Sequence, residues 1–247
     1  MLPRAALLLL LLPGAVAPAA APPQFGRAPR VGPAMRYNGQ FLLARLTYPY
    51  YEGWSYDWPD MEMNLNEILP LITSIRVPKD GTANIFRMDD PELLKFPVAY
   101  LSEPGYWHPT EPEVLGLREY ITKGGFLIVD DFHFENEWAV FEAAMKRVLP
   151  NGVIERLDVS HPIFNSFFQI KTLRVPYPGG LGQQGLYGEF YGITEYNNPQ
   201  KPLRVVIDYN MDIGDYLEWS KTNRYQVAPS NEAYKFLINY IVYGLSH

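Results

Sequence analysis

The sequence predicts a three-layer αβα protein of the α/β class, in which helices cover both faces of a mostly parallel, flavodoxin-like sheet. Apolar runs without polar alternation occur at residues 98–102, 126–129 and 203–209, which is typical of strands buried on both faces. Segments with helical spacing flank the middle run, at 111–123 before it and 135–149 after it. This alternation of helix, strand and helix is the pattern of a layered α/β domain.

The same patterns predict the remaining elements in chain order. Further strands or extended pieces are expected at 41–48, 75–77, 84–88, 153–157 and 187–196, and further helices at 60–72 and 230–245. Pro70 should kink or end the first of these helices, and Ser230 should cap the second. Residues 176–192, which are rich in glycine, and residues 210–219 are both expected to form loops.

The beginning of the chain has the pattern of a signal peptide at residues 1–19. A short positive start is followed by the apolar run 5–12 and by Ala17-Pro18-Ala19, a small-x-small cleavage site. An uncleaved anchor is the alternative, but this run is short for spanning a bilayer. Residues 20–38 are then a flexible linker rich in Pro, Ala and Gly. A single α/β domain follows at 39–247, and we expect a periplasmic or secreted protein without a transmembrane segment after signal removal.

Composition excludes several classes of function. The 247-residue chain has a formal net charge of -6, so no basic surface for nucleic acid is expected. It has no cysteine, which excludes disulfides, thiolate metal sites and a cysteine nucleophile. The sequence identifies no cofactor.

The candidate cleft lies where the central strands end. Asp130 and Asp131 directly follow the apolar run 126–129, and ligands of α/β sheets bind beyond the carboxyl ends of strands. The other candidate residues of this cleft are His133, His161, Glu103 and His108. A structural role is the competing interpretation, with one aspartate capping a helix and the other paired with a nearby donor.

Carboxylates and imidazoles together could also hold a hard or borderline metal ion such as Mg, Mn, Fe or Zn. Adjacent aspartates point in different directions on an extended chain. Asp130 and Asp131 could therefore reach one ion only if the backbone turned between them.

Six aromatic residues fall within residues 48–58. If exposed, they would form a platform for sugars, peptides or a partner protein, with Trp54, Tyr56 and Trp58 as its main contributors. If buried, they would simply cover the edge of the sheet.

Four pieces, ARLTY, DDPELLKFPVAYLS, YITKGGFLIVDDF and HPIFNSFF, resemble in their order a bacterial family of domains of unknown function, DUF4159, over residues 41–244. That family is distantly similar to class I glutamine amidotransferase-like domains, so the resemblance implies a flavodoxin-like sheet and a bacterial origin. It implies no activity. The cysteine nucleophile of amidotransferases would lie near Glu103, and its absence excludes thiol-dependent glutamine hydrolysis.

These observations favour an exported, non-catalytic module that binds a ligand or a protein, because no catalytic constellation is complete. A cell-envelope protein or a carbohydrate is the expected partner. The alternative is an exported hydrolase acting on sugars or cell-envelope material, with a metal ion at the carboxylate cluster.

Overall fold

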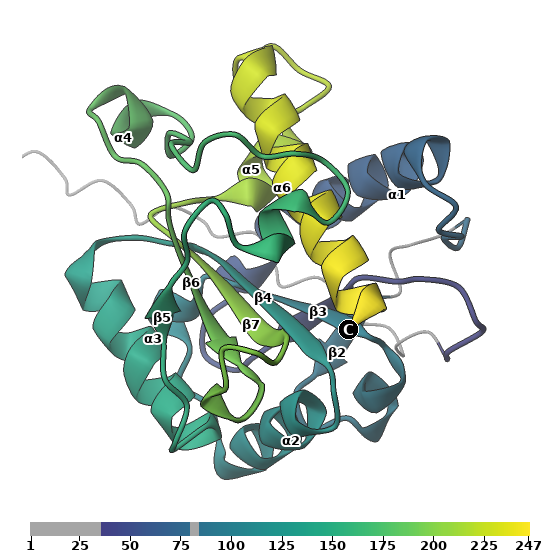
Figure 1. Ribbon diagram of the computed structural model, residues 1–247, viewed down its shortest axis with the longest axis vertical. Helices are drawn as coiled ribbons and strands as arrows, with labels where there is room; N and C mark the ends of the chain where they lie inside the picture. Colours follow the sequence, from purple (N-terminus) through teal and green to yellow (C-terminus); the bar gives the residue numbers. More distant parts are fainter. Residues whose placement is uncertain (1–35, 80–83) are drawn as a thin grey trace, which may run out of the picture.

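The computed structural model describes residues 36–79 and 84–247, so the predicted signal peptide and residues 20–35 of the linker lie outside the described residues. The described strands form one seven-stranded sheet in the order β2-β1-β3-β4-β7-β6-β5 (Figure 1). Their bounds are β1 (Ala44–Thr47), β2 (Ile85–Arg87), β3 (Val98–Ser102), β4 (Phe126–Phe132), β5 (Glu155–Arg156), β6 (Glu189–Thr194) and β7 (Leu203–Tyr209). The first five strands of that order are parallel, whereas β6 and β5 extend the sheet in antiparallel fashion.

Helices cover both faces of this sheet. Their bounds are α1 (Asp60–Ile72), α2 (Glu111–Thr122), α3 (Phe134–Val148), α4 (Gly180–Gln183), α5 (Ile213–Glu218) and α6 (Val227–Ser246). Figure 1 shows α2 and α3 on one side and α1, α5 and α6 on the other. Among the described residues, no helix combines the length and the apolar composition that crossing a bilayer requires.

The side chains of the central strands alternate between two cores, one on each face. On β3, Val98 and Tyr100 pack with α1, α5 and α6, while Ala99 and Leu101 pack with α2 and α3. Each of these four side chains is completely buried, which explains why the strand sequence lacks polar alternation. The predicted three-layer α/β fold with a mostly parallel sheet is thereby confirmed.

Several local predictions are wrong. The predicted loop 210–219 contains α5, because the Asp212 side chain caps that helix by accepting a hydrogen bond from the Asp215 amide (2.7 Å). The glycine-rich loop contains the single-turn helix α4. Helix α6 begins at Val227, so Ser230 is no cap: its hydroxyl donates to the Gln226 carbonyl inside the first turn (3.1 Å).

The strand order places a topological switch point between β1 and β3. The chain runs from β1 outward to β2 and then crosses back to β3 on the other side of β1. Helix α1 covers one face of the sheet and α2 the opposite face. Crevices at such points, beyond the carboxyl ends of the strands, are where open α/β sheets bind ligands.

Candidate functional site

The carboxyl ends of β1 and β3 are joined by one buried tyrosine. The Tyr48 hydroxyl, just after β1, donates to the carbonyl oxygens of Ser102 (3.1 Å) and Glu103 (2.6 Å). This contact fixes the backbone from which the Glu103 side chain projects at the switch point.

Three neighbouring strands end in a non-glycine residue with a left-handed backbone. Glu103 follows β3 with φ 54°, Asp131 lies in the last part of β4 with φ 62°, and Asn210 follows β7 with φ 54°. At Asp131 the register between β4 and β7 shifts, and its amide donates to the Met211 carbonyl (3.1 Å). Such residues are uncommon, and they cluster where structure around a site enforces them.

Asp130 has a structural role on the core side of this edge. Its Oδ2 accepts hydrogen bonds from the Tyr100 hydroxyl (2.6 Å) and from the amides of Ile213 (2.7 Å) and Gly214 (3.1 Å). Asp130 therefore satisfies free amides at the start of α5 rather than of α3, the helix that follows it. Burial raises its pKa to about 6, although the hydrogen bonds from Tyr100 and α5 act in the opposite direction.

Asp131 is the half-buried member of the pair. Within the described part of the chain, the hydrogen-bond contacts of its carboxylate are two long ones, from the Ser102 hydroxyl (3.4 Å) and the Tyr177 hydroxyl (3.4 Å). Burial and the nearby carboxyl of Glu103 raise the pKa of Asp131 well above its usual range.

Further carboxyl groups surround Asp131. The pKa of Glu103 is raised to about 8 by burial and by the charges of Glu137 and Asp57, partly opposed by a hydrogen bond with Tyr51. Burial and the charge of Asp131 raise the pKa of Asp212 well above its usual range. We define the carboxyl-edge cluster as Glu103, Asp131, Glu137, Asp212 and Asp215.

The exposed aromatic rings beside this cluster differ from the predicted platform. Trp54 is 4% exposed and belongs to the core, and the half-buried Trp58 donates its ring N–H to Asn84 Oδ1 (3.0 Å). Of the predicted platform, only Tyr56 is substantially exposed, at 48%. The two tryptophans are thus used to build the sheet edge.

Instead, Tyr56 belongs to a tyrosine cluster with Tyr51 and Tyr106. The rings of Tyr51 and Tyr106 stack with centroids 4.2 Å apart, and Tyr56 approaches Tyr51 at 6.1 Å. Tyr106 is 42% exposed, and its hydroxyl lies 3.5 Å from Glu137. The tyrosine cluster therefore adjoins the carboxyl-edge cluster. The sequence does not single out Tyr51 within the aromatic stretch 48–58, nor Tyr106 and Glu137, because only the fold brings these residues together.

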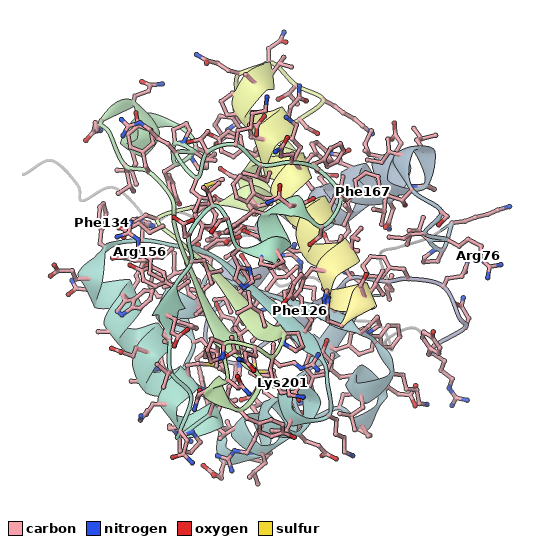
Figure 2. All side chains as sticks on the ribbon, in the orientation of Figure 1. Arg76, Phe126, Phe134, Arg156, Phe167 and Lys201 are labelled. Carbon is pink, nitrogen blue, oxygen red and sulfur yellow. The ribbon has the colours of Figure 1, made fainter. Side chains whose placement is uncertain are left out.

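Of the predicted histidines, only His133 lies at the cleft. Its backbone amide donates to Glu137 (2.7 Å), its Nδ1 lies 3.5 Å from the same carboxylate, and its ring packs on Tyr177. The adjacent Phe134 lies at the surface at the start of α3 (Figure 2).

His108 and His161 are not brought into this cleft. His108 lines a separate cavity of about 370 Å³ against α3. His161 Nδ1 accepts the Ile163 amide (3.2 Å), and its ring packs on Tyr243. Tyr243 contacts Phe126, the first residue of β4, so His161 lies toward the opposite edge of the sheet.

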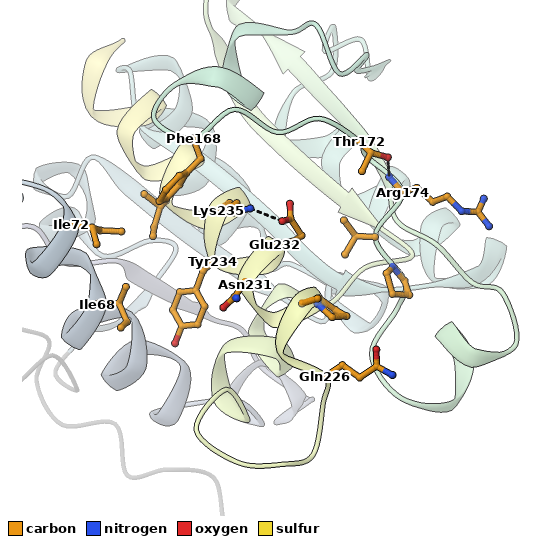
Figure 3. Close-up of a pocket in the computed structure, with 15 residues that line it drawn as sticks. Ile68, Ile72, Phe168, Thr172, Arg174, Gln226, Asn231, Glu232, Tyr234 and Lys235 are labelled. Atoms are coloured by element: carbon orange, nitrogen blue, oxygen red, sulfur yellow. Dashed lines mark hydrogen bonds and ion pairs between the residues drawn. The ribbon is translucent and has the colours of Figure 1, made fainter.

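Among the described residues, the carboxyl-edge cluster forms no preformed metal site and lies apart from the cavity along α1 and α6. Within 36–79 and 84–247, no group of three or more Asp, Glu or His side chains is arranged to hold a metal ion. A cavity of about 720 Å³ lies along α1, α6 and residues 168–176 (Figure 3), and no member of the carboxyl-edge cluster lines it. Of its three charged lining residues, Glu232 and Lys235 form an ion pair of 2.6 Å, and Arg174 lies over the ring of Tyr187.

A second group of buried charged residues lies behind the switch point and is organised around one guanidinium. Arg45 of β1 is completely buried and donates to both oxygens of Asp57 (2.7 and 3.1 Å), to Glu62 (2.6 Å) and to the Trp54 carbonyl (2.9 Å). We call Arg45, Asp57 and Glu62 the arginine cluster. Its geometry, with paired N–H···O bonds, is that of a structural ion network.

Comparison with known proteins places the chain in a family but not in a functional class. No curated protein matches it. The family model for the domain of unknown function DUF4159 matches residues 42–245, nearly all of the described chain. The chain therefore belongs to the DUF4159 family of domains of unknown function.

Proposed function

We propose that this protein is an exported, non-catalytic binding module that holds an organic cation at the carboxyl edge of its sheet. The observation that carries the proposal is the contact between the tyrosine cluster and carboxyl groups that, in the described part of the chain, form no ion pair with a lysine or an arginine. Tyr106 approaches Glu137 (3.5 Å), and Tyr51 and Glu103 are hydrogen-bonded.

A cationic ligand suits this surface for two physical reasons. The faces of tyrosine rings carry a negative quadrupole and attract ammonium or guanidinium groups. Carboxylates such as Glu103 and Asp131, which repel one another, are stabilised when a positive charge lies between them. A lysine- or arginine-containing segment of a cell-envelope protein, or an amino sugar, has this chemistry.

Because a proton and the cationic ligand would compete for Glu103, the affinity for the ligand should depend on pH. Because the pKa of Glu103 is raised to about 8, this carboxyl is largely protonated at neutral pH. A bound cation would favour its ionised form and release the proton. Affinity should therefore rise as the pH increases through about 8.

The test is calorimetric titration of the protein with an amidated trilysine peptide, a triglutamate peptide and fully N-acetylated chitotriose, which carries no charge. We expect trilysine alone to bind, with an affinity that falls with added salt and falls further in Glu103→Gln and Tyr106→Ala. Glu119→Gln on the exposed face of α2 is the matched control and should bind as the wild type does. Binding of triglutamate, or equal trilysine binding by Glu103→Gln, would contradict the proposal, whereas chitotriose binding alone would favour a neutral sugar.

Export is supported by the signal-peptide pattern at residues 1–19. Expression in a bacterial host with fractionation should place the protein in the periplasm or the medium, with Ala20 as its first residue. Retention of the intact amino terminus in a periplasmic protein would contradict cleavage after Ala19.

One observation favours the alternative of an exported hydrolase acting on sugars or cell-envelope material. A carboxyl group with a pKa near 8, such as Glu103, can serve as a general acid at neutral pH. Turnover of aryl glycosides or of isolated cell-wall material that disappears in Glu103→Gln would establish this alternative. Binding without turnover would support the module.

A further inference from the structure

Two completely buried aspartates lie on neighbouring strands behind the carboxyl edge, Asp130 on β4 and Asp208 on β7. The two strands are parallel, and the pair Val129 and Ile207 directly precedes these aspartates in register. Side chains at equivalent positions of paired parallel strands point to the same face. Both aspartates do so here, since their hydroxyl partners come from the core that α6 covers.

Each carboxyl has one engaged oxygen and one buried oxygen without a partner. Asp130 Oδ2 accepts from the Tyr100 hydroxyl (2.6 Å), and Asp208 Oδ1 accepts from the Tyr240 hydroxyl (2.9 Å). The remaining oxygens, Asp130 Oδ1 and Asp208 Oδ2, are buried and have no hydrogen-bond partner among the described residues. Two ionised carboxylates in this position would be strongly unfavourable.

The groups that face the pair supply no free positive charge. They are Tyr100 of β3, Tyr240 of α6, Asp131 of β4 and Asp212 beside α5. Arg45 of β1 lies over the Tyr100 ring at 4.8 Å, but Asp57 and Glu62 already bind it. A proton is therefore the simplest means of compensating the two carboxyl groups.

We propose that Asp130 and Asp208 share one buried proton, with Asp208 as the acid and Asp130 as the carboxylate. The assignment follows from hydrogen bonding: Asp130 accepts three donors, which favour its charged form, whereas Asp208 accepts one. The proton would reside on Asp208, whose Oδ2 is buried without a partner among the described residues, so that the pair carries a single negative charge. Burial and the charge of Asp130 both raise the pKa of Asp208, in agreement with this arrangement.

The pair also positions part of the candidate site. The Asp130 carboxylate accepts the amides of Ile213 and Gly214 at the start of α5, and this start carries Asp212 and Asp215 of the carboxyl-edge cluster. The proposed function does not require this shared proton, and the proton can be detected without any ligand.

The experiment is a ¹³C NMR titration of the full protein labelled at the aspartate carboxyl carbons, with Asp208→Asn identifying the Asp208 resonance. We expect that resonance to be at its protonated position at pH 7. In Asp130→Asn, which removes the repelling charge, the pKa of Asp208 should fall by about one unit or more. The exposed control Asp158→Asn should leave it unchanged.

An ionised Asp208 at pH 7, or an Asp208 pKa that does not respond to Asp130→Asn, would overturn the inference. If Asp130→Asn does not fold, Tyr100→Phe offers the same test, because it weakens the ionised form of Asp130 without touching Asp208. A coupled pair must then show a shifted Asp208 titration, and an unshifted one would overturn the proposal.

Discussion

The arginine cluster and the carboxyl-edge cluster lie at the same end of the sheet but treat buried charge in opposite ways. In the first, the guanidinium of Arg45 meets Asp57 and Glu62 with short, paired hydrogen bonds. In the second, Asp131 has two contacts of 3.4 Å, and its neighbours Glu103 and Asp212 are themselves acidic.

This difference distinguishes charged groups that stabilise the fold from charged groups that could still bind a ligand. A charged group whose hydrogen bonds are all made inside the protein is costly to mutate, because its partners are left buried and unpaired. Such a group has no donor or acceptor left for a ligand. Carboxyl groups that repel one another retain protons and can exchange them for a cation. Arg45 lies on β1 and Glu103 directly follows the neighbouring β3, so polar residues on or after the central strands do not alone identify a site.

The largest effect is expected in the arginine cluster. Arg45→Met leaves Asp57 and Glu62 buried without their partner and should lower the free energy of unfolding by about 3–5 kcal/mol, as measured by urea denaturation. Adding Asp57→Asn and Glu62→Gln to this variant should restore part of the loss. If Arg45→Met alone cost under about 1 kcal/mol, the cluster would not be a structural ion network.

A smaller effect is expected where the two clusters meet. A Cβ atom on Gly214, at the start of α5, would lie 2.0 Å from Asp57 Oδ2 and 3.0 Å from the Tyr100 hydroxyl. Gly214→Ala should therefore cost about 1–3 kcal/mol through overpacking. Gly180→Ala, with nothing within 4 Å of the added atom, is the control and should not destabilise the protein measurably in thermal denaturation.

The buried and half-buried carboxyl groups at this end of the sheet, Asp130 among them, should give stability an unusual dependence on pH. Unfolded Asp and Glu lose their protons near pH 4, whereas the folded protein retains them longer, with pKa values of about 6 for Asp130 and about 8 for Glu103. Stability should therefore fall as the pH rises from 4 to 8, by up to about 1.4 kcal/mol per unit for each retained proton.

Asp131→Asn sharpens this expectation, because it removes one repelling charge. It should stabilise the protein by about 1–2 kcal/mol at pH 8 and have little effect at pH 4, as measured by urea denaturation at both values. Asp158→Asn, at an exposed turn where hydrogen bonds from Ser160 lower the pKa, should give no such gain. Equal effects of Asp131→Asn at both pH values would contradict the charge repulsion.

The smallest effect is expected for exposed ion pairs. Lys123 and Glu119 lie 2.5 Å apart on α2 but are 61% and 51% exposed. Lys123→Ala should change the free energy of unfolding by no more than about 0.5 kcal/mol, and less at high salt. A larger loss would mean that the contrast with Arg45 does not depend on burial.

The sequence predicted best the strands that are buried on both faces and the helices that flank them. Strands β3, β4 and β7 and helices α2 and α3 were expected within a few residues, because burial on both faces demands such runs. Helix α5 was missed because it has only six residues, Ile213–Glu218, which is too few to show a helical periodicity. The sheet order was also beyond the sequence, because pairing between β4 and β7 depends on contacts distant in the chain.

The candidate site was predicted in part. Glu103, Asp131 and His133 were predicted to share one cleft because they lie at or just after strand ends, and the fold brings these three residues to the same end of the sheet. Tyr51, Tyr106 and Asp215 were not identified, since the first two become neighbours only through a stacked ring contact and the third lies on the missed helix. His108 was included because it lies on the loop after a core strand, and His161 because a separate turn could bring it to the cleft; the fold separates both from this edge.

The left-handed residues Glu103, Asp131 and Asn210 have a consequence for laboratory evolution. Glycine would adopt these backbone angles without strain, so selection for heat resistance alone should favour glycine at all three positions. Selection that also requires ligand binding should retain Glu103 and Asp131 and allow replacement of Asn210 by glycine. The sequences recovered under the two regimes would thus reveal which side chains the protein keeps at the expense of its own stability.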